Sequence, residues 1–216
     1  MLGFGVALYR MDIASKIIAL IVGVSLSILG CGGKSPKGYL KPGVTASQIR
    51  YIAVLPFDNI SGHPDAGRKA VNLLLTELAR TGLFEIAGVG EVEKSLRRLR
   101  IRTTAEVDLS KLKSLGEQLN VQAIVVGSVD EYEVRQEKSI TIPIVAISAR
   151  MLNVQTGDIL WTISDTHDGR DWETVFGFGR IISLTELAQI VISEMVDSLV
   201  HELKKSSKAE MGRSQK

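Results

Sequence analysis

The chain has 216 residues, with 26 Lys and Arg against 24 Asp and Glu, so its formal net charge is only +2. This near-neutral balance argues against any function that depends on a strong overall electrostatic field. An apolar content of 45% with 23% charged residues is typical of globular chains rather than disordered ones. The single cysteine, Cys31, excludes a disulfide framework, a CxxC redox pair and a cysteine-rich zinc site.

An uncharged apolar run of 13 residues, Ile17 to Leu29, lies near the N-terminus and follows Lys16. A membrane-spanning helix needs roughly 18 apolar residues. Because this run is shorter and small residues follow it, residues 1–30 are predicted to be a secretory signal peptide. Met11 begins a more compact signal than Met1 does, which makes Met11 an alternative start.

Residues 28–31, Ile-Leu-Gly-Cys, resemble a bacterial lipobox, which implies that Cys31 carries lipid and becomes the first mature residue. The remaining alternatives are a membrane-spanning helix and a buried cysteine in an uncleaved segment. In lipoproteins of diderm bacteria, a residue other than Asp after the cysteine, here Gly32, implies sorting to the outer membrane. The expected location is therefore the periplasmic face of the outer membrane, where neither nucleic acid nor nucleotides are expected as ligands.

Composition divides the mature chain into three parts. Residues 31–48 are rich in Gly and Pro after the lipidated cysteine and are predicted to be a flexible tether. Residues 49–203 contain the periodic apolar segments and are predicted to form one domain. Residues 204–216 have no core-forming content and are predicted to be a disordered tail.

The first half of the domain begins with a buried strand at residues 51–57 and a helix with apolar residues at helical spacing. Asp65 is the expected N-cap of that helix and Gly82 its C-terminal stop. A short strand at residues 83–87, a helix at residues 91–99 and a third helix capped by Asp108 follow.

The second half returns to strand at residues 121–134 and continues with a hairpin, residues 140–154 and 159–166, around a Gln-Thr-Gly-Asp turn. Ile159, Trp161 and Ile163 are expected on its inward face. A capping box of Ser183 and Glu186 starts the last helix. Its apolar stripe consists of Leu184, Leu187, Ala188, Val191, Met195 and Leu199. This order predicts a single compact α/β domain with a mixed β-sheet and flanking helices.

Catalytic and cofactor motifs are not expected. The loop of residues 62–69 has the two glycines of a phosphate-binding loop, but Arg68 and Lys69 occupy its Lys and Ser/Thr positions. The sequence has no G-x-S-x-G elbow, which a serine hydrolase would need in this or an equivalent form. An acidic stretch after the hairpin does not have calcium-loop spacing and is interpreted as a solvated loop; it contains Asp165, His167, Asp168, Asp171 and Glu173. We therefore expect no catalytic residue, cofactor or metal.

Two groups of side chains are candidate contact surfaces. The basic group is expected either on a solvated helix face or against an anionic partner, and consists of Lys94, Arg97, Arg98, Arg100 and Arg102. The aromatic group lies in a Gly-punctuated loop, where it forms either an interface or packing under the last helix, and consists of Trp172, Phe176 and Phe178.

Three stretches carry a family resemblance: IAVLPFDNISG at 52–62, AIVVGSV at 123–129 and ARMLNVQTGDILWT at 149–162. In this order, behind a lipobox, they resemble the CsgG, LpoB and TolB amino-terminal superfamily of periplasmic envelope domains. The resemblance covers residues 49–203 and implies a fold like the TolB amino-terminal or anticodon-binding domains. It also implies a role in protein contacts, with no catalytic residues to carry over.

Two departures narrow the expected function. The segment joining two predicted strands, residues 133–139, is short and charged, unlike the long hairpins of curli export pores. The tether is shorter than the spacer of an LpoB-like peptidoglycan synthase activator. We therefore expect a non-enzymatic scaffold lipoprotein that contacts other envelope proteins, with homo-oligomerisation left open. The alternatives are a CsgG-like channel subunit, an LpoB-like activator and, from a different class, an envelope hydrolase.

Overall fold

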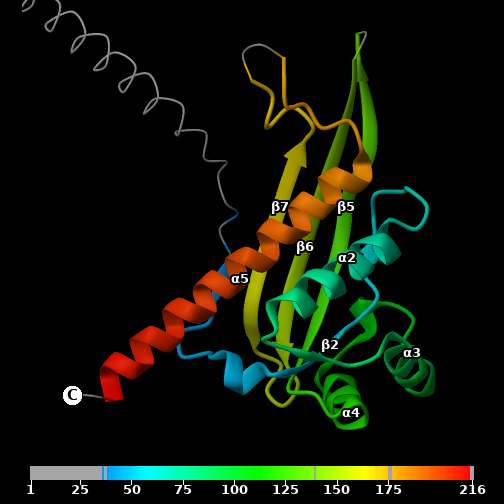
Figure 1. The fold of residues 1–216 in the computed structure, drawn as a ribbon. Helices are drawn as coiled ribbons and strands as arrows, with labels where there is room; N and C mark the ends of the chain where they lie inside the picture. The colour runs from blue at the N-terminus through cyan, green and yellow to red at the C-terminus, as the bar shows by residue number, and fades with distance from the viewer. Residues whose placement is uncertain (1–35, 37, 139, 175–176, 215–216) are drawn as a thin grey trace, which may run out of the picture. The chain divides into compact units, whose positions relative to one another are not determined.

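The computed structural model describes residues 36, 38–138, 140–174 and 177–214 (Figure 1). The predicted signal peptide and Cys31 lie outside the described residues. The strands are β1 (Tyr39–Leu40), β2 (Tyr51–Val54), β3 (Asp58–Asn59), β4 (Glu85–Ile86), β5 (Ala123–Glu137), β6 (Ile140–Asn153) and β7 (Ile159–Asp168). The α-helices are α2 (Ala66–Thr81), α3 (Val89–Arg98), α4 (Leu109–Leu119) and α5 (Leu184–Ser214). Among the described residues, no helix combines the length and the apolar content needed to cross a membrane.

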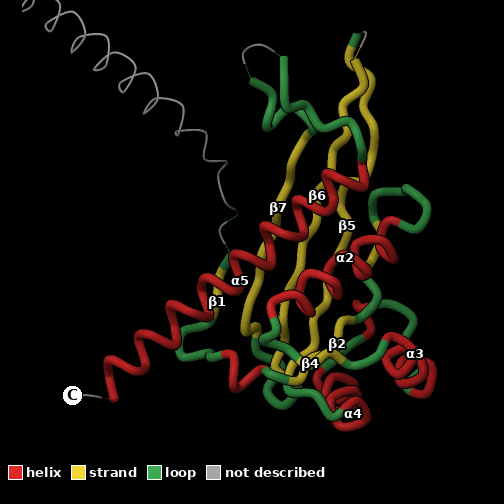
Figure 2. The backbone as a smooth tube through the Cα atoms, viewed as in Figure 1, coloured by secondary structure: helices red, strands yellow, loops and turns green. Residues whose placement is uncertain are grey.

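The strands form one mixed sheet in the order β1-β7-β6-β5-β2-β4, with β3 also paired to β5. β2 runs parallel to both β4 and β5, whereas β5, β6 and β7 form an antiparallel meander. Helices flank this sheet (Figure 2). The predicted class, a single α/β domain with a mixed sheet and flanking helices, is confirmed.

Helices cover the two faces of the sheet unequally. α2 and α5 pack on one face, where they bury Val125 and Met151 among the larger of two apolar clusters. α3 and α4 pack on the opposite face, but only over β2 and the adjoining start of β5, where Leu55 and Ile124 are buried. Beyond that point, in the described part of the chain, no helix packs on this second face of β5, β6 and β7.

Most of the predicted helix boundaries follow the expected capping chemistry. Asp108 accepts a hydrogen bond from the backbone N–H of Lys111 at 2.8 Å, and Gly82 ends α2 with φ of 66°. The hydroxyl of Ser183 accepts from the N–H of Glu186 at 3.3 Å at the start of α5. Asp65 is the N-cap residue of α2, as predicted, but its side chain makes no cap hydrogen bond and pairs with Arg68 instead.

The last part of the predicted tether, residues 31–48, belongs to the folded domain. Leu40 and Tyr39 form β1 on the edge of β7, Val44 is buried, and Lys41 pairs with Asp158 at 2.7 Å. Gly38 allows this close approach, because a Cβ there would lie 3.0 Å from the Ser198 hydroxyl oxygen. Sequence reasoning missed these contacts because the segment has no periodic apolar pattern.

The predicted disordered tail is also wrong for residues 204–214, since α5 continues to Ser214. Leu203 is the last buried residue of this helix up to residue 212, so in that part of it no core packing accounts for the extension. A helix that is already nucleated adds further turns without repeating the nucleation cost, and Lys, Ala, Glu and Met are good helix formers.

Two corrections concern the strands. The charged residues 133–137 belong to β5, and Arg135 pairs with Ile142 of β6, so the connection is a long hairpin with Lys138 near its tip. This strand was not predicted because its charged side chains lie on exposed positions.

Ile159 is 41% exposed and does not point inward as predicted. A register shift between Met151 and Leu152 of β6 changes which face of the sheet the first residue of β7 points to.

Candidate functional site

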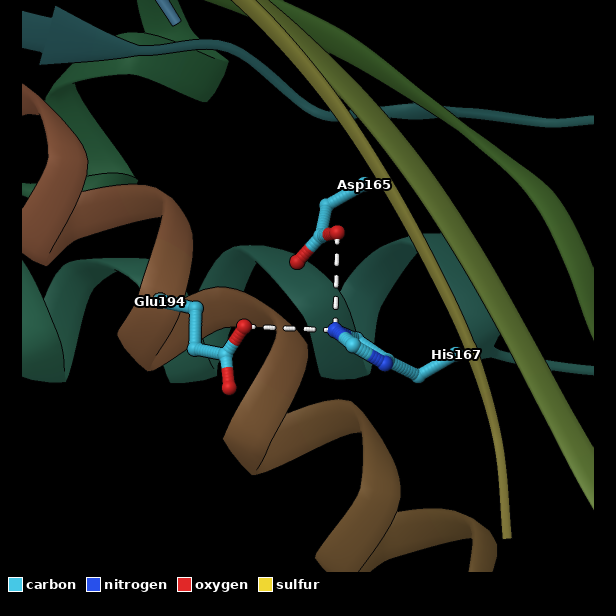
Figure 3. Close-up of side chains that lie close together, drawn as sticks. All are labelled: Asp165, His167 and Glu194. Carbon is cyan, nitrogen blue, oxygen red and sulfur yellow. Dashed lines mark hydrogen bonds and ion pairs between the residues drawn. The ribbon is translucent and has the colours of Figure 1, made fainter. Parts of the chain in front are cut away.

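A cluster of two carboxylates and one imidazole lies between the sheet and α5 (Figure 3). Asp165 and His167 are two residues apart on β7, so they share the face of the strand that α5 covers. Glu194 lies on α5, one residue before the buried Met195. Figure 3 shows the three side chains pointing toward one another, and their ligand atoms all lie within 4.8 Å of one another.

Carboxylate oxygens surround the imidazole of His167. Its Nε2 lies 3.2 Å from Glu194 Oε2 and 3.6 Å from Asp165 Oδ1, and its Nδ1 lies 2.5 Å from Asp171 Oδ2. The Trp172 ring covers the imidazole, with a ring-centre separation of 4.8 Å. The imidazole is therefore held on both nitrogens and against an aromatic ring, which fixes its orientation.

The electrostatics of the cluster favour positive charge at its centre. Burial raises the pKa of Asp165, and the neighbouring His167 offsets this only in part. Burial alone would lower the pKa of His167, but its hydrogen bond to Asp171 and the charges of Asp165 and Glu194 outweigh burial and raise it. The arrangement can hold a proton or a metal cation among its carboxylates. A hydrolytic dyad would instead pair the imidazole with a hydroxyl or thiol.

The interpretation of this region as a solvated loop is wrong for two of its residues. Asp165 is 8% exposed and His167 half-buried, because β7 extends two residues past the predicted strand end and keeps its inward alternation. Sequence reasoning missed Glu194 altogether. The available signal was its position beside the apolar stripe of α5, three residues after Val191.

The members of the predicted aromatic group lie in different environments. Trp172 is partly buried, packs against the main core and contacts His167, so it has a packing role. Phe178 is 74% exposed, and Ile182 nearby is 75% exposed. Phe176 lies outside the described residues. Of the two described members of this group, only Phe178 is exposed enough to contact a partner.

The predicted basic group lies on α3 and the turn after it. All five side chains are exposed, and Arg97 pairs with Glu93 at 3.4 Å. Arg97, Arg100 and Arg102 line a shallow hollow of about 540 Å³ together with Glu106. A solvated helix face accounts for Lys94 and Arg98, whereas the three arginines of the hollow share one concave surface.

The uncovered face of β5, β6 and β7 forms a second shallow surface, which we call the open face. A hollow of about 500 Å³ lies over it. Most of the side chains that line it are polar: Asp58, Thr104, Ser128, Ser148, Arg150, Thr162 and Ser164. The Ser148 hydroxyl donates to Asp130 at 2.8 Å and lies 3.0 Å from that of Ser164. Tyr39 and Ile60 at its border are 53% and 71% exposed.

No family model matches the sequence, and no curated protein matches it. Solved structures share its fold. PelC from Paraburkholderia phytofirmans, solved as a dodecamer, has a TM-score of 0.52 at 19% identity over 76% of this chain and 94% of its own. Lipoprotein GNA1162 from Neisseria meningitidis has a TM-score of 0.54 at 18% identity, over 70% of this chain and 99% of its own. The LpoB C-terminal domain from Salmonella enterica has a TM-score of 0.44 at 20% identity, over 58% and 85%.

Proposed function

We propose that this chain is a lipid-anchored, non-enzymatic interaction module of the bacterial cell envelope, and that it binds protein partners through the open face. The observation that carries the proposal is the unequal covering of the sheet. Helices bury one face of β5, β6 and β7, whereas no helix packs on the part of the other face around Ser148, Arg150 and Ser164 in the described chain. Antiparallel sheets tolerate one solvated face, so the domain folds without a partner there.

The composition of the open face suits a reversible protein contact. Its hydroxyl groups and Arg150 offer hydrogen bonds, and the exposed Tyr39 and Ile60 offer apolar anchors at its border. Non-obligate interfaces have this mixture, in which a few aromatic or arginine side chains contribute most of the binding energy. A continuously apolar face would instead favour an obligate partner or aggregation.

The attachment to the membrane rests on the sequence. The lipobox resemblance at residues 28–31 makes Cys31 the proposed lipid acceptor, and Gly32 supports the outer membrane, with the domain on its periplasmic face. Three acyl chains, as in mature bacterial lipoproteins, would give permanent attachment, since one chain binds only marginally. The similar fold of lipoprotein GNA1162 is compatible with this assignment.

A second copy of this chain is one partner that the open face would fit. PelC, which has a similar fold, was solved as a dodecamer. A different envelope protein is the other kind of partner. The mass of a crosslinked product separates the two, because self-association gives a multiple of the chain mass.

Photo-crosslinking in native membranes tests the contact. A photoreactive residue at Thr162, in the open face, should give a discrete adduct in the full-length lipidated chain. The same residue at Glu186, exposed on α5, is the matched control and should give none. Adducts at Glu186 with none at Thr162 would refute the open face as the contact surface.

Labelled palmitate tests the anchor separately. The unaltered chain should incorporate label and fractionate with membranes, and Cys31→Ser should do neither. Label retained by the serine variant would show that the lipobox interpretation is wrong, whatever the crosslinking result.

One observation favours the channel-subunit alternative. β5 and β6 have 15 and 14 residues, which exceeds the 9–11 that a membrane-crossing strand needs. The exposed side chains of β5 near the hairpin tip include Glu131, Glu133 and Arg135, which would be costly against lipid. The interaction module therefore accounts better for this hairpin.

A further inference from the structure

When the carboxylates of the cluster between β7 and α5 are ionised, the single imidazole offers fewer hydrogens than their oxygens can accept. If His167 is neutral and donates from Nδ1 to Asp171, its Nε2 carries a lone pair that faces the oxygens of Asp165 and Glu194. If Nε2 is protonated, its single hydrogen can serve one of the two carboxylates. Glu194 at 3.2 Å can accept it, whereas Asp165 at 3.6 Å is beyond hydrogen-bonding distance.

Asp165 provides an independent sign of a missing partner. It is 8% exposed, and its Oδ2 is buried with no hydrogen-bond partner among the described residues. Its Oδ1 accepts one hydrogen bond within the described part of the chain, from the N–H of Thr166 at 3.0 Å. Buried carboxylates normally have their oxygens satisfied by several donors or by a cation. In Figure 3 the Asp165 carboxylate points into the space between Glu194 and His167.

We propose that Asp165, His167 and Glu194 bind a divalent transition metal, for which Zn²⁺ is the best fit, and that this ion links β7 to α5. Imidazole nitrogen with carboxylate oxygen is a Zn²⁺ donor set. Bonds of about 2.0–2.2 Å in a tetrahedron place ligand atoms roughly 3.3–3.6 Å apart. Two of the three ligand-atom separations, Nε2 to oxygen at 3.2 and 3.6 Å, match this spacing, and the third, between the two carboxylate oxygens, lies within 4.8 Å.

Asp171 completes the site without contacting the ion. A metal-binding histidine commonly donates its second ring N–H to a carboxylate, which fixes the tautomer and makes the ligating nitrogen more basic. Asp171 lies 2.5 Å from Nδ1 and supplies this contact. Asp171 is therefore a positioning residue, whereas Asp165, His167 and Glu194 are the ligands.

Glu194 is the member of the cluster that reaches solvent. Its side chain is 28% exposed and lines a groove of about 810 Å³ between β1 and α5, together with Asp197, His201, Glu202 and Lys205. Lys205 pairs with Glu202, so Glu194 and Asp197 are the acidic groups of this groove that can attract a cation. Calcium and magnesium prefer six or more oxygen ligands, so the imidazole at the centre favours zinc over both.

The test uses the full-length chain in detergent, stripped of metal with a chelator and titrated calorimetrically with Zn²⁺. We expect one Zn²⁺ per chain, and a rise in Tm of about 5–10 °C when the free ion is a hundredfold above Kd. Mg²⁺ at the same concentration should leave Tm unchanged. Absence of Zn²⁺ binding to the folded, stripped chain would overturn the proposal.

Variants locate the ion. Glu194→Gln removes one ligand charge at constant size and should weaken Zn²⁺ binding at least a hundredfold, and Asp171→Asn should weaken it about 10–100-fold. His201→Gln, in the same groove but outside the cluster, is the matched control and should bind as the unaltered chain does. Equal affinity in Glu194→Gln and the unaltered chain would refute the site. Glu194 is partly exposed, so this variant should fold even if changes at His167 or Asp165 do not.

Discussion

Two halves of the sheet differ in how many of their faces are covered by helices. Where β5 passes between α4 and the α2/α5 layer, neighbouring residues point to opposite faces and both are buried, as in Ile124 and Val125 at 0% and 1% exposure. In β6, Met151 is fully buried under α5, while Arg150 beside it is exposed on the open face. In the first half helices pack on both sides of the sheet, and in the second half they pack on one side.

This contrast separates stability from function. Residues buried on both faces cannot change without a cost in the free energy of unfolding. Substituting exposed residues of the open face costs little in the free energy of unfolding. These positions can therefore carry side chains that bind a partner. A substitution that distinguishes the two halves by stability and by binding therefore tests the whole interpretation.

The largest expected effect is at the doubly covered half. Ile124→Ala removes a fully buried side chain between β5 and the α3/α4 layer and should lower the free energy of unfolding by about 2–5 kcal/mol. Arg150→Gln on the open face should change it by less than about 0.5 kcal/mol. Urea unfolding followed by circular dichroism measures both. Similar losses for the two variants would mean that the open face is buried in solution.

An intermediate effect is expected in the loop before α5. If Phe178 contributes to a partner contact, Phe178→Ala should reduce partner capture from native membranes at least tenfold, equivalent to about 1.4 kcal/mol, with Tm nearly unchanged. Trp172→Ala should lower Tm, because this ring packs on His167 and the core. Full capture by a stable Phe178→Ala variant would remove Phe178 from the interface.

The smallest expected effect is a pH dependence at the start of α4, in the doubly covered half. Hydrogen bonds from the Lys111 N–H and the Ser110 hydroxyl hold the pKa of Asp108 below 3.8, so the folded state favours the ionised carboxylate. This contribution is present at neutral pH and is lost as the pH falls through the lowered pKa. Asp108→Asn should therefore melt lower than the unaltered chain at pH 7, and the difference in Tm should shrink as the pH is lowered into the acid range. A Tm difference that grows in acid would contradict the assignment.

The sequence predicts the fold well where a pattern reports burial directly. The stripe from Leu187 to Leu199 specifies the core side of α5, and all five of its members from Leu187 onward are 0% exposed. The fold class follows from the order of such segments. β1 and the distal end of the β5–β6 hairpin were missed because partner strands hold their backbones, and their own side chains carry no periodic apolar signal.

The cluster between β7 and α5 shows a second limit of sequence reasoning. Asp165 and His167 could have been assigned to the buried face by extending the alternation of Trp161 and Ile163 along β7. Glu194 is 29 positions after Asp165, and only the packing of α5 across the sheet brings the two together. No local pattern contains that information.

The distal end of the hairpin has a consequence for dynamics. β7 ends its pairing with β6 at Ile144, and Ile142 is still fully buried, so Gln136–Glu137 and Ile140–Thr141 form the ribbon of two strands that, among the described residues, has no third neighbour in the sheet (Figure 2). Two-stranded ribbons are marginal in water, and such segments open locally long before the whole domain unfolds. Amide hydrogens at this end should exchange with solvent faster than those of β6 near Met151. A partner that bound the ribbon would order it, and the loss of conformational entropy would lower the affinity. Binding at the tip is therefore expected to be specific but weak.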